Sequence, residues 1–129
     1  MPDVNAIIHT HQPYATAAGL VTDVLPAFLT TIIDANKGPV NVAPFTISSD
    51  EGMGILAVKY AGNSLAVILK NHGVIAFGKN LEEALSSAIY LEESCKVYLA
   101  ARSVGPISLL TKEQIKNEGA YRGNYGQPV

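Results

Sequence analysis

The chain is poor in the residues that mark several classes of protein. It has one cysteine and no tryptophan, and only 16% of its residues are charged, for a net charge of −2. A single cysteine excludes a disulfide framework and indicates a reducing compartment, which we take to be the cytoplasm. Lysine and arginine never form a run, so we expect neither nucleic acid nor an anionic membrane as a partner.

Long apolar runs are also missing. The first apolar segment ends at Ile8 and follows Met-Pro-Asp, without the basic residues of a signal or transit peptide. No run approaches the ~20 residues that a membrane helix needs. The chain instead spreads 48% apolar residues over 129 positions, which suits one domain with one hydrophobic core. We therefore treat residues 1–129 as a single domain.

Strand and helix signals alternate along this domain. Short apolar runs predict strands at 4–11, 40–45, 65–70 and 74–77. Capping and turn residues predict helices at 13–18, from Ser48 and Glu51 to about 60, from Asn80 onward, and from Thr111 to about 118, followed by an irregular tail. The alternation implies a layered α/β domain.

Two segments need separate comment. Residues 25–34 favour a strand by their Thr, Ile and Phe content, with Phe28, Thr30, Ile32 and Asp34 on one face, although their length also fits a helix. The helix that begins after Asn80 is the clearest in the chain. Its apolar positions are expected on or near one face: Leu81, Ala84, Leu85, Ala88, Ile89, Cys95, Tyr98 and Leu99.

Two of the three histidines, His9 and His11, are one residue apart at the end of the first apolar run. Side chains two apart on a strand point the same way, so both imidazoles should project from one face, with Thr10 turned inward. The third histidine, His72, ends another strand and precedes a glycine. Three imidazoles with an open position are typical of a catalytic Zn²⁺ site. A histidine near a strand end is also often a plain hydrogen-bonded or surface residue, and the residues alone leave the reaction open.

Two stretches of the chain are similar to the class II aldolase/adducin family. The stretch PDVNAIIHTHQPYATAAGL resembles its zinc-binding strand and following helix, and AVILKNHGVIAFGKNLEEALSSAIYLEES resembles its second hallmark. The resemblance implies a layered αβα domain with a central mixed or antiparallel sheet. It also implies that His9, His11 and His72 hold Zn²⁺ or another divalent cation. Members carry a further N-terminal part with a sugar-phosphate pocket and an acidic residue, so we expect sequence upstream of Met1.

The family resemblance implies a zinc-dependent aldolase that cleaves a small ketose phosphate by retro-aldol chemistry, through an enediolate that the metal stabilises. The alternative is a sugar-phosphate epimerase that uses the same bond cleavage, like L-ribulose-5-phosphate 4-epimerase. The tail NYGQ and the segment LTTIID resemble the epimerase and suggest Tyr125 and Asp34 as catalytic acid/base residues. Fuculose aldolases have a tyrosine in the region that corresponds to 28–31, and this chain has none there.

The remaining expectations concern subunit assembly and the alternative, non-catalytic roles of the chain and of its candidate residues. Both acid/base residues would be donated across a subunit boundary, which implies a homo-oligomer, typically a tetramer. Asp34 and Tyr125 also fit a solvated turn carboxylate and a tail residue without a catalytic role. A relative of the adducin type would be a non-catalytic interaction domain, and the chain alone could be an inactive fragment. Glu92 and Glu93 fit surface charges, although Glu92 could help to orient a ligand histidine.

Overall fold

The computed structural model describes residues 3–47 and 51–124 of the chain. Five strands form one mixed sheet in the order β1-β5-β4-β3-β2, in which β3 and β4 run parallel and the other neighbours antiparallel. The strands are β1 (Ala6–Thr10), β2 (Val24–Leu25), β3 (Val40–Ala43), β4 (Ala66–Leu69) and β5 (Gly73–Gly78). The helices are α1 (Pro13–Ala18), α2 (Thr30–Asn36), α3 (Glu51–Ala61), α4 (Leu81–Arg102) and α5 (Lys112–Asn124).

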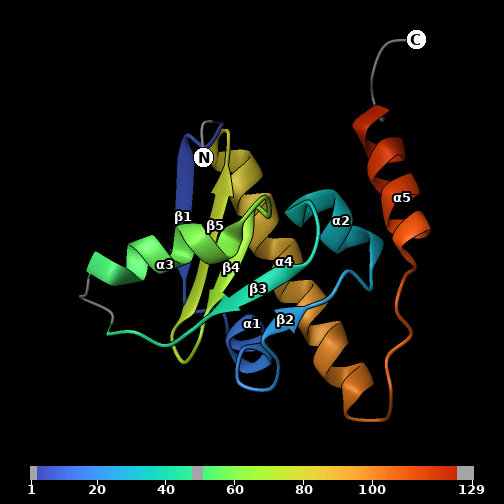
Figure 1. Cartoon of the computed structure of the whole chain (residues 1–129), viewed down its shortest axis with the longest axis horizontal. Helices are drawn as coiled ribbons and strands as arrows, with labels where there is room; N and C mark the ends of the chain where they lie inside the picture. Colours follow the sequence, from blue (N-terminus) through green and yellow to red (C-terminus); the bar gives the residue numbers. More distant parts are fainter. Residues whose placement is uncertain (1–2, 48–50, 125–129) are drawn as a thin grey trace.

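Helices cover both faces of this sheet. Helix α3 lies against one face, and α1, α2 and α4 lie against the other, while α5 stands beside α2 (Figure 1). The layered αβα fold with a mixed sheet is therefore confirmed. Within the described residues, no helix is both long and apolar enough to cross a membrane.

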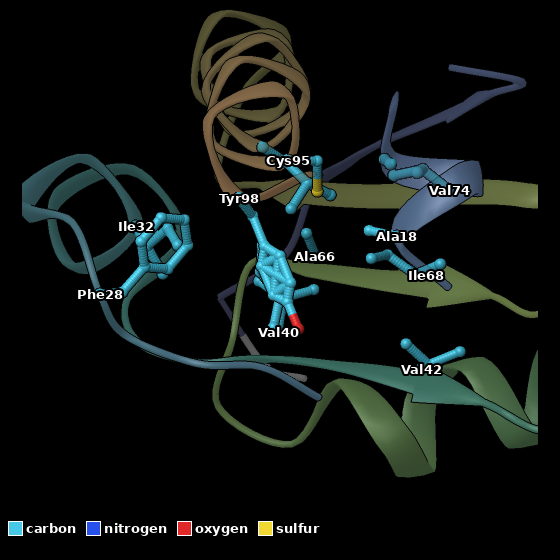
Figure 2. Packing of buried hydrophobic residues seen from close by; sticks show 13 residues of the cluster. Ala18, Phe28, Ile32, Val40, Val42, Ala66, Ile68, Val74, Cys95 and Tyr98 are labelled. Carbon is cyan, nitrogen blue, oxygen red and sulfur yellow. The ribbon is translucent and has the colours of Figure 1, made fainter. Parts of the chain in front are cut away.

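Strand β4 explains why two apolar layers form. All four of its residues are buried, as the continuous apolar run predicted. Ala66 and Ile68 belong to the core under α1, α2 and α4, whereas Val67 and Leu69 face α3. The first of these layers is drawn in Figure 2, where Tyr98 of α4 packs edge-on against Phe28, with ring centroids 5.7 Å apart.

The strand favoured for residues 25–34 is wrong. Only Val24 and Leu25 pair in the sheet, and Thr30–Asn36 forms α2. Helix α2 buries the adjacent Ile32 and Ile33 together, which a strand could not do on one face. It also bonds to α4, since Asn36 donates from Nδ2 to the hydroxyl of Ser87 at 2.8 Å. Packing on α4 thus overrides the strand preference of Thr and Ile.

Two other expectations need correction. The apolar face predicted for α4 includes Leu81, Leu85 and Ile89, but these are 68%, 50% and 53% exposed. Helix α4 instead turns a row of mainly small residues to the sheet: Ala84, Ser87, Ala88, Leu91, Ser94, Cys95 and Tyr98. The last helix runs to Asn124 rather than ending near 118.

The helix starts follow the predicted capping residues where the structure describes them. The side chain of Asn80 accepts from the amide of Glu83 at 2.8 Å. Thr111 and Gln114 cap each other reciprocally, with distances of 2.9 and 3.1 Å. Ser48, expected to cap α3, lies outside the described residues. Helix α1 has the predicted bounds, with Pro13 in its first turn.

Candidate metal centre

The three histidines meet at one end of the sheet. His9 on β1 and His11 just beyond it project from the same face, with ring centroids 5.1 Å apart. His72 comes from the turn between β4 and β5, and its ring centroid lies 4.9 Å from that of His9 and 5.1 Å from that of His11. One ligand nitrogen from each ring lies within 4.8 Å of the others. Among the described residues, no other group of three His, Cys, Asp or Glu side chains gathers in this way.

The turn that carries His72 depends on unusual backbone conformations. Asn71 has a φ of 61°, and the amide of His72 donates to the carbonyl of Leu69 at 3.0 Å, which closes the turn. Gly73 follows at the start of β5, where β1 passes very close. A Cβ at position 73 would lie 3.0 Å from the His11 ring and would strike the carbonyl of Thr10. Only glycine lets the two histidine segments approach this closely.

One hydrogen bond fixes which nitrogen of His9 is available. Its Nδ1 lies 2.8 Å from the carbonyl oxygen of Val74 on β5. A carbonyl can only accept, so Nδ1 carries the proton and the lone pair is on Nε2. A backbone carbonyl of this kind commonly orients a metal-binding histidine. The contact itself follows from strand pairing, because β1 and β5 are neighbours in the sheet.

The surroundings of His72 favour its neutral form. The pKa of His72 lies below its usual value, first because burial disfavours the charged ring and then because His9 and His11 repel it. A neutral imidazole has the lone pair that a metal ion requires. Three neutral nitrogen donors from two chain segments suit Zn²⁺ or a related divalent cation. The residues present therefore fit such an ion.

Side chains behind the site connect it to α4. Thr10 points to the inner face, as predicted, and its hydroxyl donates to Oε1 of Gln12. Gln12 in turn donates from Nε2 to the carbonyl of Ala88 at 2.9 Å. Sequence reasoning missed Gln12, because a glutamine after a strand has no pattern that reveals a partner 76 residues away.

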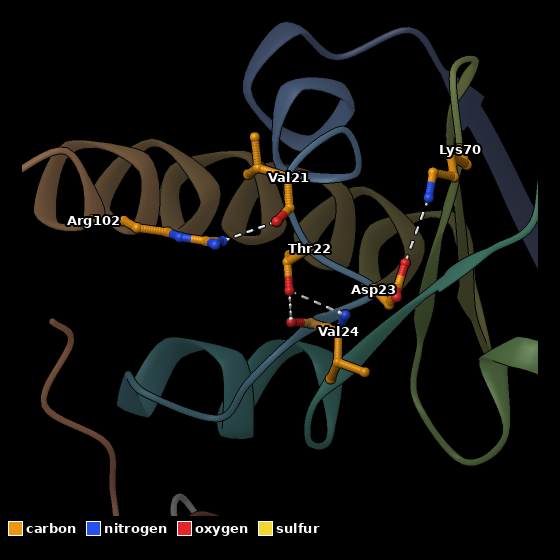
Figure 3. A network of polar contacts seen from close by, with 6 residues as sticks. All are labelled: Val21, Thr22, Asp23, Val24, Lys70 and Arg102. Atoms are coloured by element: carbon orange, nitrogen blue, oxygen red, sulfur yellow. Dashed lines mark hydrogen bonds and ion pairs between the residues drawn. The ribbon is translucent and has the colours of Figure 1, made fainter.

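A second polar network lies beside the turn of His72 (Figure 3). Lys70 pairs with Asp23 at 3.5 Å, and Arg102 of α4 donates to the carbonyl of Val21 at 3.0 Å. Thr22 closes the same loop by donating to the carbonyl of Val24 at 2.9 Å. These contacts hold the loop between α1 and β2 against both α4 and the end of β4.

Of the two residues suggested as acid/base groups, only Asp34 lies in the described part of the chain. Asp34 is on α2 and lines a cavity of about 490 Å³ between α2 and the start of α4. None of the described residues around this cavity is one of the three histidines. Tyr125 lies outside the described residues. The structure thus brings together His9, His11 and His72 but does not join Asp34 to them within one chain.

Comparison with known proteins gives a consistent result. The model of a family described as "Class II Aldolase and Adducin N-terminal domain" matches residues 1–99. A 5-deoxy-D-ribulose 1-phosphate aldolase of Bacillus thuringiensis serovar kurstaki is 32% identical over 126 residues, 97% of this chain and 58% of that protein. A 3-oxo-tetronate 4-phosphate decarboxylase of Pectobacterium atrosepticum is 36% identical over 101 residues, 74% of this chain and 46% of that protein.

A solved structure is similar as well. An L-fuculose 1-phosphate aldolase superposes with a TM-score of 0.86 at 30% identity, covering 92% of this chain and 56% of its own. This chain therefore spans about half the length of the curated relatives that it matches. The similarity includes both segments that carry the histidines, since residues 9, 11 and 72 all lie within the range of the family match.

Proposed function

The chain belongs to the class II aldolase and adducin family, and from that premise we propose that it is the metal-binding portion of an aldolase for a small ketose phosphate. The observation that carries this proposal is the convergence of three imidazoles within 4.8 Å. Three imidazoles with an open coordination position are typical of a catalytic metal site rather than a structural one, which is closed by four ligands. The histidines therefore favour an enzyme over an adducin-like interaction domain.

We propose that His9, His11 and His72 hold Zn²⁺, with another divalent cation as the alternative. A cation bound there would supply Lewis-acid stabilisation of negative charge on a substrate oxygen. The chain's own contribution is to present three imidazole nitrogens: Val74 holds the proton on Nδ1 of His9, which leaves Nε2 for the ion, and the lowered pKa of His72 favours its neutral ring. Zinc is the first choice because imidazoles alone, with an open position, suit it well.

The substrate class is inferred from the relatives. The two aldolases above are named for 5-deoxy-D-ribulose 1-phosphate and L-fuculose 1-phosphate. We propose retro-aldol cleavage of a ketose 1-phosphate of this size, in which a carbon–carbon bond breaks and an aldehyde is released. We propose that the catalytic unit includes residues beyond this chain, since the match covers only 58% of the 5-deoxy-D-ribulose 1-phosphate aldolase.

For Asp34 and Tyr125 we propose acid/base roles at the metal centre of a neighbouring subunit. Asp34 lines a cavity whose described residues include none of the three histidines, so within one chain it has no evident route to the metal. A homo-oligomer, of which a tetramer is the expected form, would bring it to a second centre. We also propose a cytoplasmic protein, because its one cysteine, Cys95, is a buried free thiol.

Decarboxylation of a 3-oxo acid phosphate is a second candidate. The relative from Pectobacterium atrosepticum is named for that reaction and is the more identical of the two curated relatives described above. Aldol cleavage and decarboxylation of a 3-oxo acid both break a carbon–carbon bond at the carbon beside a carbonyl group. One cation that stabilises negative charge on the carbonyl oxygen could therefore serve either reaction. An epimerase of the L-ribulose-5-phosphate type remains the third candidate, supported by the NYGQ tail.

The experiment has a binding arm and a catalytic arm. Metal content after dialysis against chelator and reconstitution with Zn²⁺ is measured for the chain, for His72→Ala and for Asn63→Ala, whose side chain is exposed on another turn. We expect about one tightly held zinc per chain in the unchanged chain and in Asn63→Ala, and none in His72→Ala. Zinc uptake that survives His72→Ala would overturn the proposed site.

The catalytic arm uses this chain and a version extended upstream along its reading frame. Both are supplied with ketose 1-phosphates and with a 3-oxo acid phosphate, and the release of aldehyde or carbon dioxide is measured. We expect aldehyde release that requires both the metal and the extension. Carbon dioxide release alone would replace the aldolase by the decarboxylase.

A further inference from the structure

Helix α1, which follows directly after His11, is capped by a residue from another helix. Glu92 of α4 accepts hydrogen bonds from two successive backbone amides, from Tyr14 through Oε2 at 3.0 Å and from Ala15 through Oε1 at 2.8 Å. Both carboxylate oxygens are therefore used. These are charge-assisted bonds, which are stronger than bonds between neutral groups.

Helix α1 needs this outside partner. It has only six residues, and Gln12 at its N-cap makes no side-chain capping bond. Pro13 has no amide hydrogen, so Tyr14 and Ala15 hold the first free donors of the helix. Without Glu92 these two amides would lose their acceptors, the amide of Tyr14 in an exposed position and that of Ala15 in a partly buried one. A helix this short is not stable by itself.

The residues that flank His11 are fixed to the same part of α4. On one side, Thr10 donates to Gln12, and Gln12 donates to the carbonyl of Ala88. On the other side, Glu92 holds the first turn of α1. Ala88 and Glu92 are one helical turn apart on α4. The backbone at His11 is thus held from both directions by one turn of a single helix.

Helix α4 can hold the backbone beside His11 in place because it is long and well packed. It has 22 residues, and it buries seven of them against the sheet and the neighbouring helices. It also packs closely on α1, where Lys96 lies 5.6 Å from the centre of the Tyr14 ring. By contrast with Glu92, which bonds to α1, the next residue along α4, Glu93, is exposed.

We propose that Glu92 is a positioning residue for the metal ligand His11: by holding the first turn of α1 on α4, it sets the affinity of the three-histidine site for its cation. This inference rests on the proposed function, since it assumes that the histidines bind a metal. The two hydrogen bonds of Glu92 go to the backbone amides of Tyr14 and Ala15. Glu92 acts through the backbone of residues 12–15, and not by a bond to a ligand ring.

The test is a titration of the metal-free chain with Co²⁺, followed by the visible absorption of the bound ion. Three variants are compared with the unchanged chain: Glu92→Gln, Glu92→Ala and the matched control Glu93→Gln. Far-ultraviolet circular dichroism and thermal unfolding are recorded for each, so that loss of fold is separated from loss of the site. Glu92→Gln keeps the size of the side chain and one carbonyl acceptor.

We expect Co²⁺ affinity to fall by about tenfold in Glu92→Gln and further in Glu92→Ala, with an altered spectrum, while Glu93→Gln matches the unchanged chain. Loss of a supporting partner around metal ligands typically costs about 10- to 100-fold in affinity. If Glu92→Ala does not fold, the conservative variant decides.

Two results would overturn the inference alone. One is a folded Glu92→Gln that is less stable yet binds Co²⁺ with unchanged affinity and spectrum, and the other is failure of both Glu92 variants to fold. Either would give Glu92 a purely structural role. An unchanged chain that binds no Co²⁺ would overturn the proposed function, and this inference with it.

Discussion

The imidazole of His9 is held by the carbonyl oxygen of Val74, 65 residues further along the chain, at 2.8 Å from Nδ1. The bond joins the two strands that carry the histidine segments. It also decides the tautomer before any ion arrives: a carbonyl can only accept, so Nδ1 of His9 must be the nitrogen that carries the proton. The free lone pair is thereby placed on Nε2.

The tautomer of His9 can be observed directly. In ¹⁵N-labelled, metal-free protein at neutral pH, we expect Nδ1 of His9 to carry the hydrogen and Nε2 to resonate as a nitrogen with a free lone pair. Zinc should then shift Nε2 and leave Nδ1 protonated. Long-range ¹H–¹⁵N correlation spectra provide the measurement. Protonation at Nε2 in the metal-free protein would contradict the assignment.

Gly73→Ala should damage both stability and metal binding. Its methyl group would press on the carbonyl of Thr10 and on the His11 ring. Overpacking of this kind costs about 1–3 kcal/mol, and the displaced His11 should weaken zinc binding. The control is Gly54→Ala in α3, where nothing lies within 4 Å of the added group. We expect the control to gain about 0.5–1 kcal/mol in the free energy of unfolding by urea; equal effects of the two changes would refute the close approach.

Asn36→Ala should destabilise the fold without affecting the metal. Nδ2 of Asn36 donates to the carbonyl and to the hydroxyl of Ser87, at 3.0 and 2.8 Å, and that hydroxyl donates to the carbonyl of Leu65. Losing two buried bonds and leaving a cavity should cost about 2–4 kcal/mol. The exposed Asn63→Ala should change the unfolding free energy by less than about 0.5 kcal/mol. Urea unfolding of both variants checks this difference.

Stability should fall at alkaline pH through Cys95. Burial first, and then the charge of Glu92, raise the pKa of its thiol from 9.0 to about 12. In the unfolded chain the thiol ionises near its ordinary pKa, so its contribution to stability is complete below pH 9 and declines between pH 9 and 12. The stability difference between the unchanged chain and Cys95→Ala should therefore shrink as the pH rises above about 9. A disulfide reagent should reach the thiol at pH 8 only after unfolding.

Asp23→Asn should have little effect. The ion pair with Lys70 is 3.5 Å long, but the side chains are 86% and 41% exposed. Such pairs contribute about 0–1 kcal/mol. We expect a change in unfolding free energy within that range and unchanged zinc affinity. A large loss of zinc binding would show that the loop after α1 holds the turn of His72 more firmly than these contacts imply.

The convergence of the histidines could be predicted because it depends on simple rules. Side chains at positions two apart share one face of a strand, which brought His9 and His11 together. The glycine after His72 indicated a close backbone approach, and Gly73 indeed lies against Thr10 and His11. The capping pairs at Asn80 and Thr111 were readable for the same reason, since each involves residues three apart.

The errors arose where distant contacts decide. Segment 25–34 has residues that suit either a strand or a helix. The bond between Thr31 and Ser94 of α4, and the bond from Asn36 just beyond the segment to Ser87, select the helix. Leu81 and Leu85 have the spacing of a buried face, but α4 approaches the sheet through smaller residues. Neither choice is visible within a short window of sequence.

The supporting residues of the site were harder still. Gln12 and Glu92 are polar residues on their own segments, without a motif around them. Their partners are 76 and 77 residues away in the sequence. The sequence suggests Glu92 as a group that could orient a ligand ring, whereas the structure bonds it to the backbone of α1.

The place of β1 at the edge of the sheet also affects how the protein is made. Its only partner among the described strands is β5, which a ribosome synthesises dozens of residues later. Closing so long a loop is slow compared with local helix formation. A nascent chain would therefore expose His9 and His11 before His72 exists, and the three-histidine cluster would form only once translation has passed β5.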